Sequence, residues 1–202
     1  MIQFIISFLV LLNPFALFIY LNPIAKDLNR KDYLMVLVKA GGLSLLIFLG
    51  FALFGRIIFE KILLIDFSSF KIFGGVVITA YALIFIIQGR KSFFTLKGSL
   101  DDLAAEIALP FMVGAATISL CIIIGNRFHP FAASGIITLT MIIHISLVFF
   151  LTILKYSLFK ERLKVAFDKT MGMFLRLNGF IVGAIGSNLI ISGIREFFSI
   201  SV

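Results

Sequence analysis

Six long apolar segments are the feature of this sequence that most restricts its fold. An α-helix rises about 1.5 Å per residue, so roughly 20 apolar residues cross a hydrocarbon core of about 30 Å. Hydrophobic residues make up 61% of the 202-residue chain, well above the usual content of soluble domains. We therefore predict an all-α membrane protein with six transmembrane helices, at about residues 2–21, 33–55, 67–88, 103–125, 131–154 and 171–194.

The basic residues between these segments predict the orientation of the chain. Connections on the cytoplasmic side of a membrane carry an excess of Lys and Arg. The connections after the first, third and fifth segments hold Lys26, Arg30, Lys31, Arg90, Lys91, Lys97, Lys155, Lys160, Arg162, Lys164 and Lys169. The opposite side holds Arg56, Lys61, Arg127 and Arg195. This bias predicts a multi-pass protein of the cell inner (plasma) membrane with both termini outside.

The distribution of chemically active residues narrows the function classes. The net charge of +8 is spread between apolar segments, which favours contacts with lipid head groups over a nucleic-acid interface. A single cysteine and two histidines, His129 and His144, do not suggest a metal or cofactor site. An enzyme would need ionisable groups clustered at one depth, so no enzyme is expected. The expected partners are a small-molecule substrate and the bilayer, with a homo-oligomer left open.

A helix break is predicted halfway along the first span, at Asn13-Pro14-Phe15-Ala16. Proline has no N–H to donate to the carbonyl of Val10, and it disfavours helical geometry at Asn13. Inside a membrane the freed backbone groups must face protein, water or a ligand. A kink tolerated by neighbouring helices is the alternative interpretation.

The second half of the chain repeats features of the first. The fourth span carries Leu109-Pro110-Phe111, which echoes the first-span break, and residues 70–74 and 175–179 share an apolar–basic–aliphatic–any–Gly pattern. A repeat with an odd number of spans inserts its second copy upside down, as in many secondary transporters. We predict two inverted three-helix repeats, residues 1–102 and 103–202, with helices 1 and 4 discontinuous.

Two interrupted helices that meet near the midplane would offer backbone donors from one half-helix and backbone acceptors from the other. These are the groups that a zwitterionic amino acid needs. Asn13 adds an amide, Thr117 and Ser119 add hydroxyls, and the small residues after Pro110 leave space. The predicted substrate-binding residues are Asn13, Pro14, Phe15, Ala16, Pro110, Gly114, Ala115, Ala116, Thr117 and Ser119.

Ionisable residues inside predicted spans are candidates for coupling transport to an ion. Glu106 lies about one turn before Pro110, and His144 lies in the middle of the fifth span. Lys71 and Arg176 lie near the entrances of the third and sixth spans. For each residue a structural role, as an interfacial anchor, a solvated group or a packed histidine, is the alternative.

Several of these motifs together resemble the MarC family of six-span bacterial and archaeal inner-membrane proteins, over nearly the whole chain. The resemblance implies two inverted three-span repeats with discontinuous first and fourth helices. For at least some members it also implies transport of small neutral amino acids such as glycine and alanine. The motifs are residues 13–16, the basic first loop, residues 70–75, Asp101 through Pro110, Gly114, and residues 176–179 and 191–194.

The chain departs from the family pattern at three places. Ile19 stands where members usually have a second proline, Gly114-Ala115-Ala116 where they often have Gly-Pro-Gly, and Glu106 where they have a proline. The expected function is a transporter or exporter of glycine- or alanine-like amino acids that works by alternating access. Transport of another small solute and a non-transporting membrane scaffold are the alternatives.

Overall fold

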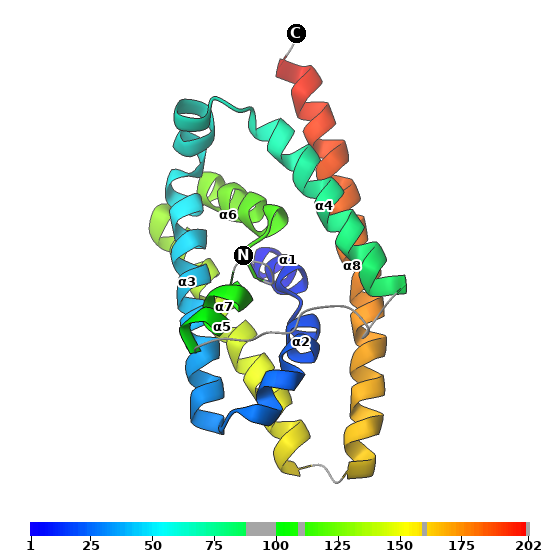
Figure 1. Cartoon of the computed structure of the whole chain (residues 1–202). Coiled ribbons are helices and arrows are strands. Elements are labelled where there is room, and N and C mark those ends of the chain that lie inside the picture. The colour runs from blue at the N-terminus through cyan, green and yellow to red at the C-terminus, as the bar shows by residue number, and fades with distance from the viewer. Residues whose placement is uncertain (88–99, 109–111, 159–160, 201–202) are drawn as a thin grey trace.

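The computed structural model describes residues 1–87, 100–108, 112–158 and 161–200, and it has no strand among them. Most of this chain is α-helical, and the two short helices η1 and η4 are π-helices (Figure 1). The elements are α1 (Ile2–Leu12), α2 (Pro14–Asp27), α3 (Arg30–Ile57), η1 (Ile58–Leu63), α4 (Phe67–Ile87), α5 (Leu100–Ile107), α6 (Ala115–Arg127), α7 (Pro130–Ile153), η4 (Leu154–Leu158) and α8 (Glu161–Ile200).

Five helical segments of the described chain are long and apolar enough to cross a membrane, which confirms an all-α, multi-pass protein. They are Ile2–Asn22, Arg30–Gly55, Phe67–Ile87, Pro130–Tyr156 and Leu163–Ser199. They coincide with the first, second, third, fifth and sixth predicted spans. In place of the predicted fourth span, the structure has two shorter helices, α5 and α6.

Local sequence signals explain where the long helices begin. The Asn29 side chain accepts a hydrogen bond from the Asp32 amide at 2.9 Å, which caps the first turn of α3. Pro130 occupies the first position of α7, where its missing N–H costs no hydrogen bond. These starts allow tight connections from α2 to α3 and from α6 to α7.

Helices α4 and α8 run side by side because small residues face each other along their length (Figure 1). A Cβ added to Gly75 on α4 would lie 2.6 Å from the carbonyl oxygen of Gly186 on α8. A Cβ added to Gly193 would lie 2.8 Å from the carbonyl oxygen of Ser68. Lipid offers helices no hydrophobic reason to associate, and close backbone approach through small residues favours their packing by van der Waals contact.

The remaining helices pack in a crossed pattern. Helix α3 contacts α5 and α6 from the second half of the chain, whereas α7 contacts α1 and α2 from the first half. Likewise α4 contacts α6, and α8 contacts α2. Each half therefore packs largely against the other rather than against itself.

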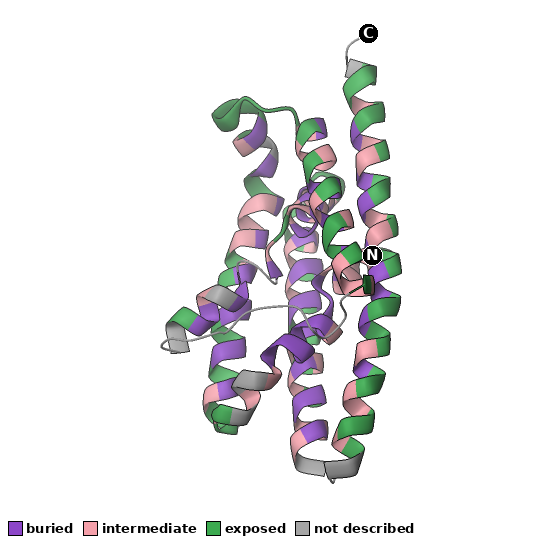
Figure 2. Ribbon diagram, turned by 45° about the vertical axis from the view of Figure 1, so that its right-hand side comes forward, coloured by how far each residue is buried: buried purple, intermediate pink, exposed green. Residues whose placement is uncertain are grey.

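Two clusters of buried apolar residues result from this packing. The larger cluster joins α1, α2, α3, α5, α6 and α7, with two residues from α8. The smaller cluster contains Ile78 and Ala82 of α4, Ala116 of α6, and Val182 and Leu189 of α8. Figure 2 shows the purple buried residues concentrated in the middle of the bundle, while α8 carries exposed residues along its whole length.

Candidate functional site

The first helical segment is divided at Asn13, which separates α1 from α2. Its backbone has φ 47° and ψ 72°, the left-handed conformation that asparagine tolerates better than most residues. Its amide donates to the Leu9 carbonyl at 3.0 Å, and its side-chain oxygen accepts from the Ala16 amide at 3.1 Å. Asn13 therefore ends one helix and caps the next. In Figure 1, α1 is seen nearly end-on while α2 runs downwards, so the two helices meet at a steep angle.

The backbone carbonyl of Val10, which cannot bond to Pro14, has a partner from the far end of the chain. The side-chain amide of Asn178 on α8 donates to this oxygen at 3.3 Å. Asn178 is itself buried. An unpaired carbonyl in an apolar interior carries a desolvation cost, so this bond stabilises the break and ties α8 to it.

The start of α6 has its own hydrogen-bond arrangement. The Thr117 hydroxyl oxygen accepts from the Gly114 amide at 2.9 Å. The same hydroxyl lies within donating distance of the carbonyl oxygens of Met112, at 3.1 Å, and Gly114, at 2.9 Å. A helix leaves its first N–H groups without intrahelical partners and carries a partial positive charge there. The Thr117 hydroxyl therefore fixes the backbone of Met112 and Gly114 next to the first N–H groups of α6.

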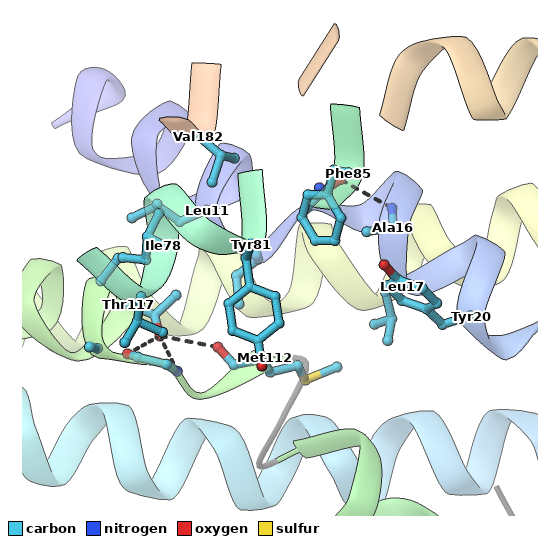
Figure 3. Close-up of a pocket in the computed structure, with 16 residues that line it drawn as sticks. Leu11, Ala16, Leu17, Tyr20, Ile78, Tyr81, Phe85, Met112, Thr117 and Val182 are labelled. Carbon is cyan, nitrogen blue, oxygen red and sulfur yellow. Dashed lines mark hydrogen bonds between the residues drawn. The ribbon is translucent and has the colours of Figure 1, made fainter. Parts of the chain in front are cut away.

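A cavity of about 130 Å³ lies between the α1–α2 junction and the start of α6 (Figure 3). For comparison, an engineered protein cavity of roughly 150 Å³ holds a benzene molecule. The cavity is at the meeting point of the two apolar clusters. Its lining residues are Leu11, Leu12, Asn13, Ala16, Leu17, Tyr20, Val77, Ile78, Tyr81, Phe85, Met112, Gly114, Ala115, Ala116, Thr117 and Val182.

The polar character of this cavity comes from uncharged groups. None of the described residues that line it is ionised at neutral pH. The side-chain nitrogen of Asn13 is buried and has no hydrogen-bond partner among the described residues. A buried amide N–H without a partner carries a desolvation cost.

The structure brings six of the ten predicted substrate-binding residues to the cavity: Asn13, Ala16, Gly114, Ala115, Ala116 and Thr117. Three others are placed elsewhere. Pro14 is buried in the first turn of α2, and the Phe15 ring stacks on Phe174 of α8 with centroids 5.3 Å apart. Ser119 is buried on α6, two residues beyond the lining. Pro110 lies outside the described residues.

The four predicted coupling residues do not gather at one place. His144 is fully buried on α7, and neither ring nitrogen has a hydrogen-bond partner in the described part of the chain. Lys71 forms an ion pair with Glu196 and lies over the Phe67 ring, at 4.7 Å from its centroid. Arg176 is exposed on α8. Glu106 belongs to α5, but its side chain lies outside the described part of the structure.

Comparison with known proteins decides the family. The model of the family described as "MarC family integral membrane protein" matches residues 1–198. The chain belongs to the MarC family. The "UPF0056 membrane protein PH0214" of Pyrococcus horikoshii is 24% identical over 186 residues, which cover 92% of this chain and 88% of that protein. No solved structure matches the chain.

This MarC family protein also has cavity residues that sequence reasoning missed. Tyr20, Tyr81 and Phe85 contribute rings to the lining. Nothing in their local sequence distinguished them, because the chain contains 25 phenylalanines and four tyrosines, mostly in apolar segments. Asn178, which bonds to the Val10 carbonyl at the helix break and is not in the cavity lining, did have a signal, since it lies in one of the motifs that carry the family resemblance.

A buried polar network joins three elements of this MarC family protein at the end of the bundle away from the C-terminus. The Lys155 ammonium lies 2.6 Å from the Asp168 carboxylate of α8 and 2.9 Å from the Asn22 side-chain oxygen of α2. The Tyr156 hydroxyl lies 3.2 Å from the same Asn22 oxygen. Lys155 is only 4% exposed, so its charge depends on these partners.

Asn178→Leu is expected to destabilise the protein by about 1–3 kcal/mol, because it leaves the Val10 carbonyl buried without a donor. Thermal unfolding of the purified protein in detergent measures the effect. Asn188→Leu is the matched control, since Asn188 is an exposed asparagine on the same helix. Equal melting temperatures for the two variants would show that the Asn178 bond contributes nothing.

Proposed function

We propose that the protein is a transporter or exporter of small neutral amino acids, such as glycine or alanine, with alternating access around two interrupted helices. The observation that carries this proposal is the uncharged cavity between Asn13 and the first turn of α6. Asn13, Ala16, Gly114, Ala115, Ala116 and Thr117 are its proposed substrate-binding residues.

The electrostatics of the cavity favour a solute with no net charge. Burial of an ion without a charged partner is costly, and the described lining offers no such partner. A zwitterion has zero net charge but needs local compensation at each end. The partial positive charge at the start of α6, and its first N–H groups, which have no partner within the helix, suit its carboxylate. The size of the cavity favours a small side chain.

The packing pattern supports two repeats, and the odd number of predicted spans in each repeat predicts that the second is inverted. An exchange of the two halves maps α1–α2 onto α5–α6, α3 onto α7 and α4 onto α8. The contacts of α3 with α5 and α6 then correspond to those of α7 with α1 and α2. Both α3 and α7 also continue into a π-helix, η1 and η4 respectively. We therefore propose that α1–α2 and α5–α6 are equivalent interrupted spans in an inverted pair.

The proposed location is the cell inner (plasma) membrane with both termini outside. The excess of basic residues in the connections after the first, third and fifth predicted spans supports this orientation. In that orientation, the Lys155 network lies on the cytoplasmic side, and the ion pair between Lys71 and Glu196 lies on the outer side.

Flux measurements in vesicles test the proposal. Vesicles that contain the purified protein are expected to take up or release labelled glycine or alanine faster than empty vesicles. Thr117→Val is expected to abolish this flux, because valine has the shape of threonine but neither accepts from the Gly114 amide nor donates to the Met112 carbonyl. Thr170→Val, at an exposed threonine of α8, is the matched control and is expected to retain it.

Two results would contradict the proposal. Flux no greater than that of empty vesicles, for glycine, alanine and other small solutes, would favour a non-transporting scaffold. Flux of a different small solute alone would retain transport but reject the amino-acid substrate.

A further inference from the structure

Three aromatic rings form one wall of the cavity. Tyr20 comes from α2, and Tyr81 and Phe85 come from successive turns of α4. The Phe85 ring centroid lies 6.4 Å from the centroids of both tyrosines, with interplanar angles of 43°. All three residues line the same cavity as Asn13 and Thr117. The rings thus form a contiguous aromatic surface from two helices, hereafter called the aromatic wall.

The aromatic wall and the start of α6 are distinct parts of the cavity lining. In the view of Figure 3, the Tyr81 ring lies between Thr117 on one side and Tyr20 and Phe85 on the other. The α6 side provides backbone N–H groups and a partial positive charge, which suit an anion. The ring faces are electron-rich, and they attract a cation within about 6 Å of the ring centroid. The start of α6 therefore suits an anion, and the aromatic wall suits a cation.

We infer that Tyr20, Tyr81 and Phe85 bind the ammonium group of the substrate through their ring faces and that the cavity consequently accepts N-methylated amino acids. This inference rests on the proposed function and adds the residues that select the amine. The described lining offers the ammonium no carboxylate. Methylation removes N–H donors but preserves the positive charge, so ring recognition tolerates it, whereas recognition by hydrogen-bond acceptors does not.

Equilibrium binding to the purified full-length protein, measured by calorimetry, tests the inference. The probes are glycine, N-methylglycine, N,N-dimethylglycine and propionate, which has a carboxylate but no ammonium. N-methylglycine is expected to bind at least as tightly as glycine. Tyr81→Leu and Phe85→Leu are each expected to weaken glycine binding about 3- to 30-fold, the range of a single cation–π contact. Tyr81→Phe retains a ring face and is expected to bind glycine like the wild type.

For each variant, the affinity for glycine is divided by the affinity for propionate. A folding defect affects the binding of both probes, so a change in this ratio reports recognition of the ammonium group. The leucine variants are expected to lower this ratio, since propionate has no charge for the rings to attract. An unchanged ratio would overturn the inference. So would rejection of both methylated probes by a wild-type protein that binds glycine. In those two cases the proposed function stands, whereas a wild-type protein that binds none of the amino acids would overturn both.

Discussion

Asn13→Val is expected to lower the free energy of unfolding by about 2–4 kcal/mol. Asn13 has a left-handed backbone that a β-branched residue adopts only with strain, and valine also removes the cap on the Ala16 amide. Thermal or chemical unfolding in detergent measures the loss. The same variant is expected to show no glycine flux in vesicles.

Asn13→Gly separates the two roles of this residue. Glycine adopts the left-handed conformation at no steric cost, and at a helix N-cap it costs only a few tenths of a kcal/mol relative to asparagine. This variant is therefore expected to stay within about 1 kcal/mol of the wild type in stability. It nevertheless loses the side-chain amide of Asn13, a proposed substrate-binding residue that lines the cavity, so glycine binding should fall. Glycine flux equal to that of the wild type would exclude the Asn13 amide from substrate binding.

Asp168→Leu is expected to destabilise the protein by about 3–5 kcal/mol, because it removes the Asp168 carboxylate from the buried Lys155 ammonium. The loss is measured as a fall in melting temperature under identical detergent conditions. The double variant Lys155→Met/Asp168→Leu removes both charges, and it is expected to recover most of the loss because two apolar side chains then fill the same space.

The ion pair at the other end of α8 provides the control. Glu196→Gln removes a partner of Lys71, but Glu196 is exposed, so a change of less than about 1 kcal/mol is expected. If Asp168→Leu destabilises no more than Glu196→Gln, or if the double variant is no better than the single, burial of Lys155 does not govern the stability of this end of the bundle.

The positions of the apolar helices could be predicted from sequence because the length of a membrane span follows directly from bilayer thickness. Helix ends were less predictable. Helix α8 begins at Glu161 rather than near Met171, because its mixed charged and apolar first turns continue the helix beyond the apolar segment. The division at Asn13 coincides with the Asn-Pro pair, whose effect on the backbone is local and therefore visible in sequence.

Part of the site could be predicted from residues with a clear local role. Asn13 before a proline, the small residues at 114–116 and the hydroxyl of Thr117 were predicted for such roles, and all of them line the cavity. Phe15 belongs to the same motif as Asn13, yet its ring stacks on Phe174, because successive residues of a helix point in different directions and the tertiary packing decides which of them meet the cavity. Tyr20, Tyr81 and Phe85 reach the cavity through the tertiary arrangement of α2 and α4, which no local pattern reports.

The placement of the cavity between two apolar clusters has a mechanical consequence. One side of its lining belongs to the cluster of α4, α6 and α8, and the other side to the larger cluster. A molecule in the cavity makes van der Waals contacts with both clusters. In an empty cavity, the lining atoms lack these contacts. A bound molecule is therefore expected to oppose any separation of the two apolar clusters.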